Sequence, residues 1–180
     1  MEERDFGVIE IKPIGFVSRI SPDENERDRG LVARIVLDEA LTPALDGTEE
    51  WSHIHVIFWL DRVTQTAEPV LHHPGSGAGI LAARSPIHPN PIGLTLVELV
   101  KREENVLWVR GLDAYEGTPV LDIKPYPDWE QGRLQVVTDF RIPAWLQKIM
   151  EQQGQAASQP MRPSSTRSSR RARPRLTPRN

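Results

Sequence analysis

Residues 83–95, ARSPIHPNPIGLT, lead without a break into the apolar stretch IGLTLVELV at residues 92–100. The first of these segments contains three prolines, Pro86, Pro89 and Pro91. Each proline fixes its own φ angle at about −65° and keeps the preceding residue extended, so the sequence predicts a stiff loop followed by a β-strand. Such a loop presents Arg84 and His88 in nearly fixed directions at the start of the strand. We interpret it as one wall of a binding site.

Apolar residues alternate in most of the other segments, and this pattern is typical of β-strands. In HIHVIFWL, residues 53–60, successive side chains point to opposite faces, and both faces are largely apolar. We therefore expect a central strand that is covered on both sides. The charged sequence KREE at residues 101–104 is expected to form a hairpin connection. The predicted strands are residues 8–20, 31–37, 53–60, 92–100, 105–112, 119–123 and 134–138.

Helical patterns are few in this chain. Residues 38–46 are expected to form a short helix interrupted by Pro43. Pro143 is well placed in the first turn of an amphipathic helix that runs to about Gln152. Many short strands joined by turns rich in glycine and proline predict an all-β fold, a barrel or a sandwich, rather than alternating βαβ units.

The composition is typical of a single domain with one core. The chain has 180 residues, which is enough to bury a sizeable core. It contains no cysteine, which excludes disulfides and thiolate ligands and leads us to expect a cytoplasmic protein. No apolar run approaches the roughly 18 residues that a membrane-spanning helix needs, so we expect no membrane partner.

Charge is divided unevenly along the chain. Residues 151–180 contain seven arginines and one glutamate, a net charge of +6, so residues 1–150 carry −9 of the total of −3. This arginine-, serine- and proline-rich tail has few large apolar residues and is predicted to be disordered. We therefore expect the folded domain to occupy residues 1–150. The tail is either a tether for nucleic acid or a solubilising extension.

A second dense segment, GLDAYEGTPVLDIKPY, occupies residues 111–126. Asp122 and Lys124 are two residues apart, so a regular strand would place them on one face. Taken alone, this segment is more typical of an ordinary turn followed by a surface ion pair. Its combination with the proline-rich loop favours a functional site instead.

All five histidines lie between residues 53 and 88. His53 and His55 would share one strand face, an arrangement that suits a divalent metal. No third histidine or carboxylate completes a ligand set by its spacing, and packing within the barrel is the simpler explanation of the pair. We therefore predict no metal site, and a histidine-ligated metal enzyme is the least favoured alternative.

Three segments, taken in order, resemble a known family. EEWSHIHVIFWLDR (residues 49–62), ARSPIHPNPIGLT and GLDAYEGTPVLDIKPY are similar to the patterns FSHIWVLFWxH, GVFATRSPxRPNPIGLS and GLDxxDGTPVLDIKPY. These patterns are typical of the TsaA-like family, which contains the TrmO-type tRNA methyltransferases. The similarity extends from about residue 11 to residue 129, and the two long motifs in this order are highly specific.

The resemblance implies a TsaA-like β-barrel methyltransferase that binds S-adenosylmethionine near the interface of a homodimer. Relatives in this family methylate N6 of threonylcarbamoyladenosine, the modified base beside the anticodon, which implies tRNA as the partner. Matched residue by residue, the implied cofactor-binding positions are Asp61, Arg62, Arg84, Leu94, Asp113, Ala114 and Tyr115.

Some positions depart from the family pattern. His88 stands where arginine is usual, and Asp61 stands where histidine is common. Residues 23–30, DENERDRG, also lack the PRQ-like cofactor-binding sequence of the family. The differences at His88 and Asp61 motivate a second hypothesis, a non-catalytic barrel that binds nucleotides or RNA.

Methyl transfer to an adenine N6 releases a proton, so the implied reaction calls for a general base. Asp122 and His88 are the two catalytic candidates, provided that they reach the acceptor nitrogen. The reaction otherwise requires that the acceptor be held in line with the methyl group, and a stiff proline-rich wall can supply that positioning.

Deletion of residues 153–180 tests the tether. We expect the truncated protein to keep its fold and to bind RNA more weakly, with the greater loss at low salt, because arginine–phosphate contacts release counterions. Binding titrations with tRNA at several salt concentrations measure both the affinity and its salt slope. An affinity and a slope equal to those of the full-length chain would contradict the tether.

Overall fold

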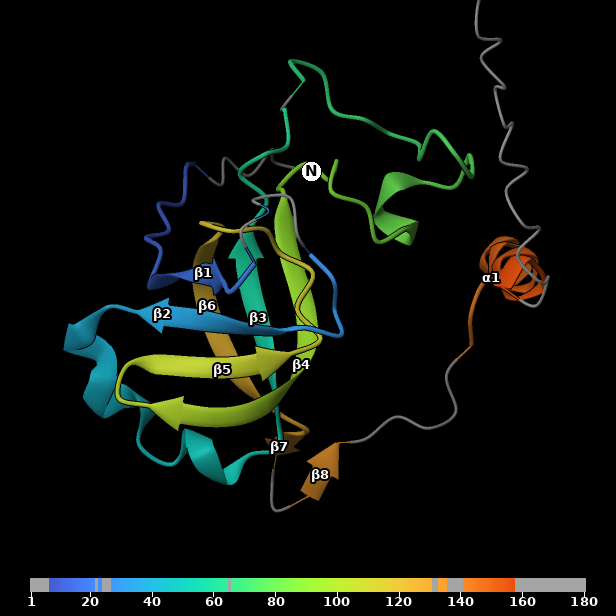
Figure 1. Cartoon of the computed structure of the whole chain (residues 1–180). Helices are drawn as coiled ribbons and strands as arrows, with labels where there is room; N and C mark the ends of the chain where they lie inside the picture. Colours follow the sequence, from blue (N-terminus) through green and yellow to red (C-terminus); the bar gives the residue numbers. More distant parts are fainter. Residues whose placement is uncertain are drawn as a thin grey trace, which may run out of the picture. The chain divides into compact units, whose positions relative to one another are not determined.

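Six antiparallel strands close into a barrel in the computed structural model of the chain (Figure 1). The strand order is β1-β2-β5-β4-β3-β6, and β6 pairs back to β1. The all-β barrel predicted from the sequence is therefore confirmed. The strands of the barrel are β1 (Gly15–Arg19), β2 (Val32–Leu37), β3 (His53–Trp59), β4 (Ile92–Glu103), β5 (Val106–Arg110) and β6 (Pro119–Tyr126).

The chain divides into two units, Met1–Thr138, which contains the barrel, and Asp139–Asn180. The second unit contains helix α1, Ala144–Ala157, so the domain boundary predicted after residue 150 falls within a helix. No helix of the described residues is both long and apolar enough to cross a membrane. The tail predicted to be disordered lies outside the described residues from residue 158 onward. The structure describes residues 7–21, 23, 27–64, 66–130, 133–135 and 141–157.

Alternating side chains explain why these strands close around one core. In β3, Ile54, Val56 and Phe58 point inward and are almost completely buried. Gly93 of β4 lies directly opposite Phe58 in the strand register. A side chain at residue 93 would overlap the phenyl ring, so the core requires glycine at this crossing.

The outer face of β3 differs from the prediction. β3 is central, with β4 on one side and β6 on the other, as expected. However, the outward residues His53, His55 and Ile57 are only partly buried, and Trp59 at its end remains 36% exposed. The reason is that a barrel is a single layer, in which each strand has only one face toward the core.

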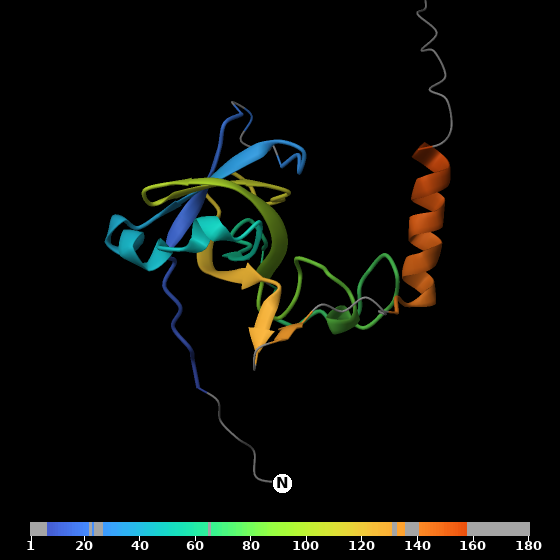
Figure 2. The ribbon, with the colours of Figure 1, turned by 90° about the horizontal axis from the view of Figure 1, so that it is seen from below.

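β4 is longer than predicted, because the charged sequence KREE mostly continues the strand. Residues 101–103 belong to β4, and the hairpin turn starts at Glu104, which has a φ of 53°. The charges are accommodated because they are paired: Nη1 of Arg102 lies 3.1 Å from Asp46 and 3.2 Å from Glu49. A bulge just before this part of β4 adds to the bending of the strand around the barrel, which Figure 2 shows.

Other boundaries also moved relative to the prediction. The strand predicted for residues 8–20 is only β1, because the preceding residues from 7 to 14 have no regular structure. Short 3₁₀ turns connect β2 to β3, and the first of them accommodates Pro43. A hairpin of β7 (Asp128–Glu130) and β8 (Arg133–Gln135) overlaps the strand predicted for residues 134–138, of which 136–138 lie outside the described residues. The 3₁₀ turns are η1 (Glu39–Leu45), η2 (Thr48–Glu50) and η3 (Ile80–Ala82).

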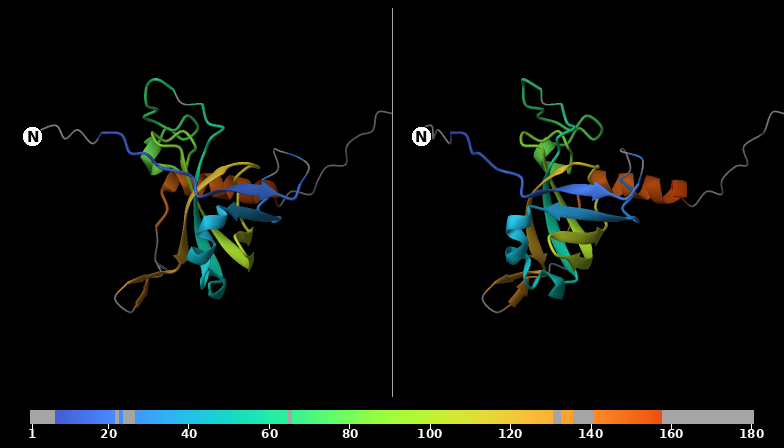
Figure 3. Two further views of the ribbon diagram at one scale, coloured as in Figure 1. Left: turned by 90° about the vertical axis from the view of Figure 1, so that its left-hand side faces the viewer. Right: turned by 60° about the vertical axis from the view of Figure 1, so that its left-hand side comes forward.

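Three loops gather at one end of the barrel. Because neighbouring strands are antiparallel, the connections after β1, β3 and β5 must emerge at the same end. The longest, residues 60–91, extends beyond the barrel end in every view of Figure 3, and the β7–β8 hairpin lies at the other end. The topology therefore brings the two sequence motifs together. The three loops are residues 20–31, 60–91 and 111–118.

Candidate functional site

Two connected lobes form a cavity where the three loops meet. Their volumes are about 300 Å³ and about 500 Å³. Arg27, Leu60, Pro86 and Asp113 line both lobes, so the two form one site. Arg84 lines the larger lobe together with Asp113. The proline-rich motif and the GLDAYEGTP motif therefore share a cavity.

The smaller lobe contains five of the positions implied to bind the cofactor, Asp61, Arg62, Asp113, Ala114 and Tyr115. The first two follow directly after β3, and the other three lie in the loop of residues 111–118. This loop bends at Gly111, with a φ of 103°, and at Gly117, with a φ of 78°. Glycine is required at both bends because other residues rarely adopt these angles.

The larger lobe contains Arg84, Leu94 and His88. The guanidinium group of Arg84 donates a hydrogen bond to the carbonyl oxygen of Leu94, which ties the proline-rich loop to β4. Nε2 of His88 lies 2.7 Å from the carbonyl oxygen of Ala83. A carbonyl oxygen can only accept, so Nε2 carries a proton and Nδ1 of the neutral ring is left as an acceptor.

A buried hydroxyl holds the carboxylate of Asp113. Oγ1 of Thr95 donates to Oδ1 of Asp113 at a distance of 2.7 Å. Thr95 is a buried residue of β4, on the same face as apolar core residues. The bond fixes one oxygen of the carboxylate and leaves Oδ2 as an acceptor for hydroxyl or amino groups of a ligand.

Tyr115 has two guanidinium groups over its ring. Cζ of Arg62 lies 4.4 Å from the ring centroid, and Cζ of Arg27 lies 5.3 Å from it. Arg62 also donates to the carbonyl oxygen of Glu116 at 3.2 Å. Contacts of this kind hold a cation against an aromatic face by electrostatic attraction, so Tyr115 orders both arginines at the rim of the smaller lobe.

The lining of the cavity is more positive than the domain around it. Its arginines are Arg27, Arg62 and Arg84, and its acidic residues are Asp61 and Asp113. Residues 1–150 as a whole carry a net charge of −9. A local excess of arginine in an acidic domain favours ligands with carboxylate or phosphate groups.

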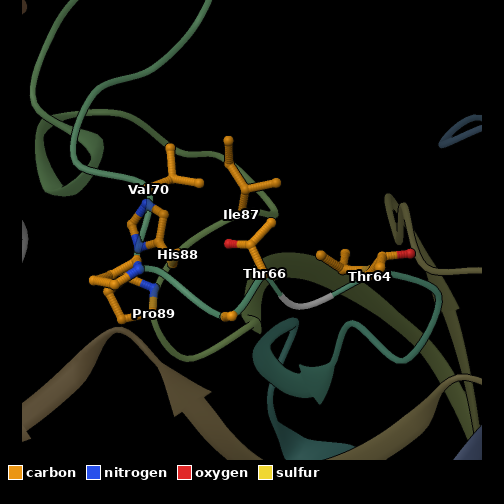
Figure 4. Close-up of a pocket in the computed structure, with 9 residues that line it drawn as sticks. Thr64, Thr66, Val70, Ile87, His88 and Pro89 are labelled. Carbon is orange, nitrogen blue, oxygen red and sulfur yellow. The ribbon is translucent and has the colours of Figure 1, made fainter.

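A smaller pocket of about 190 Å³ adjoins both lobes. Val63 lines this pocket and the smaller lobe, and His88 lines this pocket and the larger lobe. Figure 4 shows Thr66, Val70 and Ile87 around the pocket, beside His88. The walls are mainly aliphatic, so a ligand that extended past His88 would enter an apolar space.

The structure does not bring Asp122 to the cavity. Oδ2 of Asp122 lies 2.8 Å from Nζ of Lys124, and Oδ1 accepts a hydrogen bond from the backbone N–H of Ile123. The hydrogen bond to Asp122 raises the pKa of Lys124. The surface ion pair that the sequence left open is therefore the arrangement found. Of the two candidates for a general base, only His88 lines the cavity.

His53 and His55 are engaged in separate contacts on β3. Nδ1 of His53 lies 3.0 Å from Oγ of Ser52. The ring of His55 packs edge-on against Tyr126, with the ring centroids 5.4 Å apart. Within the described ranges, no cluster of three or more His, Cys, Asp or Glu residues could hold a metal ion.

Arg27 and Thr95 also line the cavity, and neither was predicted from the sequence. Arg27 lies in the segment DENERDRG, which differs from the family pattern and offered no other signal. Thr95 ends the proline-rich motif, and a polar residue in an apolar alternation is a signal that could have identified it. Arg27 contacts Tyr115, and Thr95 contacts Asp113; both of these partners were predicted.

The fold and the cavity define a class of protein, a closed antiparallel barrel whose loops build one ligand site at a barrel end. The family described as the tRNA-methyltransferase O N-terminal domain matches residues 18–129. A crystal structure of TrmO from Pseudomonas aeruginosa, 27% identical, superimposes with a TM-score of 0.59. That match covers 77% of this chain and 63% of the other.

Two curated relatives also match this chain in sequence. A probable S-adenosyl-L-methionine-binding protein of Methanothermobacter thermautotrophicus is 39% identical over 126 residues, which are 66% of this chain and 90% of that protein. The tRNA (adenine(37)-N6)-methyltransferase of Homo sapiens is 37% identical over 108 residues, which are 55% of this chain and 24% of that protein. The match thus spans about a quarter of the human protein. The chain belongs to the TrmO family, as the sequence motifs predicted.

Proposed function

We propose that the chain transfers a methyl group from S-adenosylmethionine to N6 of threonylcarbamoyladenosine, the modified base beside the anticodon in tRNA. Membership of the family and the similarity to the relatives described above support a tRNA (adenine-N6)-methyltransferase that depends on S-adenosylmethionine. We also propose the threonylcarbamoyl-modified base as the acceptor, the roles of the individual site residues given below, and a cytoplasmic location.

One observation carries the proposal: both specific motifs of the sequence line the same cavity. Arg84 comes from the proline-rich loop and Asp113 from the loop after β5, and they lie 29 positions apart along the chain. A shared cavity allows the two loops to hold one ligand between them. No motif alone would give that arrangement, because each loop supplies only one wall.

The cavity suits S-adenosylmethionine in size and in chemistry. Its lobes fall at or near the range of about 300–1,000 Å³ that is common for small-molecule sites. The carboxylates of Asp61 and Asp113 can accept hydrogen bonds from ribose hydroxyls and from an amino group. Leu60 and Leu94 offer apolar surface to the adenine ring. When bound, the cofactor supplies a methyl group on a positively charged sulfur.

His88 is the residue we assign to the proton of the acceptor nitrogen. Its Nε2 is committed to the carbonyl oxygen of Ala83, so Nδ1 is the atom available to take up a proton. The same hydrogen bond fixes the ring at the boundary between the larger lobe and the apolar side pocket. An acceptor base that reached the cavity from this side would therefore meet Nδ1 in a fixed position.

The arginines of the cavity rim offer contacts for the RNA backbone. Arg27 and Arg62 are held over Tyr115, and they provide positive charge that the domain as a whole lacks. A base in the anticodon loop is already exposed, so its entry into a cavity costs less than extrusion from a duplex. We assign these arginines to phosphate groups of the anticodon loop.

We also propose a homodimer, formed through the outer face of β3 and β4. Trp59, Ile92, Leu94 and Leu96 are 36%, 42%, 47% and 37% exposed. Trp59 pairs with Ile92, and the partly buried Ile57 pairs with Leu94, so these side chains form one continuous apolar face. Such faces mark interaction sites. Ile92 and Leu94 also line the larger lobe, so a second copy of the chain would cover the cavity at this edge.

A transfer assay tests the reaction. The purified chain is incubated with S-adenosylmethionine and with tRNA that carries threonylcarbamoyladenosine without the final methyl group. We expect the modified nucleoside to gain the mass of one methyl group. Retention of the RNA without a mass change would indicate the non-catalytic barrel instead. Equal methylation of tRNA that lacks the threonylcarbamoyl group would contradict the proposed substrate.

Asp113→Asn tests the cofactor side of the cavity. The change removes the charge and keeps the shape, and hydrogen bonds to charged groups contribute about 1.5–3 kcal/mol, so we expect the Kd for S-adenosylmethionine to rise by roughly 10- to 100-fold. Titration calorimetry measures the Kd. Asp122→Asn is the matched control, since Asp122 pairs with Lys124 outside the cavity, and its Kd should equal that of the wild type. Equal effects of the two variants would count against the site.

His88→Gln tests the assigned proton acceptor. The glutamine amide can still donate to the carbonyl oxygen of Ala83, but it cannot accept a proton. We expect kcat to fall by about 100-fold, the lower end of general-base effects, and the Kd for S-adenosylmethionine to stay within about twofold. Single-turnover transfer and calorimetry measure the two quantities. A kcat close to that of the wild type would rule out His88.

Leu96→Arg tests the dimer. A charge in the centre of the apolar face should convert the dimer to a monomer and weaken binding of S-adenosylmethionine, because the cavity loses its cover. Phe16→Arg is the control: Phe16 is 46% exposed on β1, away from this face, and its variant should remain dimeric. Analytical ultracentrifugation gives the masses. A wild-type monomer, or a Leu96→Arg dimer, would contradict the assignment.

A further inference from the structure

Arg19 is a charged side chain in the barrel interior. It is the last residue of β1, and only 6% of it is exposed. Val17, two residues earlier, is completely buried, so Arg19 occupies an inward position that is normally apolar. Burial of a guanidinium group carries a large desolvation penalty. The contacts that offset this penalty show what the residue holds in place.

Those contacts are backbone carbonyl oxygens on both sides of Asp113. Nε and Nη2 of Arg19 donate to the carbonyl oxygen of Ala114 at 3.0 Å and 2.6 Å. Nη2 also donates to the carbonyl oxygen of Leu112 at 2.7 Å. One side chain therefore fixes the peptide group just before Asp113 and the peptide group that follows Ala114. Their orientation determines the direction in which the carboxylate of Asp113 leaves the backbone.

Arg19 also connects this loop to the loop that follows β1. Nη1 donates to the carbonyl oxygen of Asp28 at 3.3 Å, and the backbone N–H of Arg19 donates to the carboxylate of Glu116. Asp28 is the neighbour of Arg27, which lines both lobes of the cavity. One buried side chain thus links the two loops that form the cofactor side of the site.

We propose that Arg19 is the positioning residue of the cofactor cavity, which acts through the backbone on both sides of Asp113. The inference rests on the proposed binding of S-adenosylmethionine in this cavity. Arg19 lines neither lobe of the cavity. It orients Asp113 from the barrel side, while Thr95 holds the carboxylate itself.

A lysine at this position could not form all of these hydrogen bonds. The guanidinium group presents five donors in a planar fork, and it reaches the carbonyl oxygens of Leu112, Ala114 and Asp28 at once. The ammonium group of lysine is a single point with three donors, so it would keep the charge but not all of the contacts. The Kd of Arg19→Lys for S-adenosylmethionine should therefore lie between that of the wild type and that of Arg19→Met.

The first experiment compares Arg19→Met with a variant that is destabilised elsewhere in the core. Leu107 of β5 is completely buried near the opposite end of the barrel, so Leu107→Ala is the control. We expect the Kd and the KM for S-adenosylmethionine to rise by on the order of 10- to 100-fold in Arg19→Met, with kcat at saturation within about twofold of the wild type. Leu107→Ala should lower the unfolding midpoint and leave the Kd unchanged.

The second experiment is chemical rescue. Arg19 lines a surface pocket with Ile20 and Leu31, so the space vacated in Arg19→Ala adjoins a pocket at the surface. Millimolar guanidinium, well below denaturing concentrations, should restore much of the affinity for S-adenosylmethionine in Arg19→Ala. The same concentration of methylammonium should restore less, and neither ion should change the affinity of Leu107→Ala.

The outcomes separate this inference from the proposed function. A wild type that does not bind S-adenosylmethionine overturns both. If the wild type binds S-adenosylmethionine and Arg19→Met binds it with the same Kd, the role of Arg19 alone is overturned. The same holds if Leu107→Ala loses as much affinity as Arg19→Met. If Arg19→Met does not fold, Arg19→Lys decides: a Kd raised several-fold supports the role, and an unchanged Kd refutes it.

Discussion

Asp113 is held by contacts from two strands of the barrel. Thr95 of β4 bonds its carboxylate, and Arg19 of β1 bonds the carbonyl oxygens before and after it. Both residues occupy inward positions, so the place of the carboxylate is tied to the register of the strands and not to the loop alone. Sites that are supported by rigid elements in this way hold their ligands with more accurate geometry than sites on unsupported loops.

The opposite wall of the cavity is stiffened by different means. Prolines restrict the backbone around His88, Arg84 bonds β4 through the carbonyl oxygen of Leu94, and Nε2 of His88 bonds within its own loop. The antiparallel barrel requires that this loop and the loop after β5 emerge at the same end. A cavity between two supported walls follows from the topology. Its arginines then give an acidic domain a local preference for anionic groups.

Much of the fold follows from the sequence, because the alternation of apolar residues predicts the strands. The prediction was wrong at residues 101–103, where charges suggested a turn, because ion pairs such as that of Arg102 with Asp46 allow a strand to carry them. It also expected full cover on the outer face of β3, which is only partly buried in the structure. A short apolar strand does not show whether a second layer or a partner covers it. The order of the strands in the barrel depends on pairings between distant segments and could not be derived from the pattern.

The site was predicted in part. Arg84 and Asp113 line one cavity as the two motifs indicated, and Asp122 does not line it, since its partner on the surface is Lys124. Arg19 and Thr95 were not predicted. Each interrupts an apolar alternation, but the sequence does not show which loop such a side chain holds, and that role is identified only when the loop is seen beside it.

A crystal structure of the chain with S-adenosylhomocysteine tests most directly whether the two motifs hold one cofactor between them. We expect the ligand to occupy the two-lobed cavity, with the carboxylate of Asp113 at hydrogen-bonding distance, about 3 Å, and with Arg84 on the facing wall. A ligand bound elsewhere on the barrel, or one that contacts only one of the two loops, would contradict it.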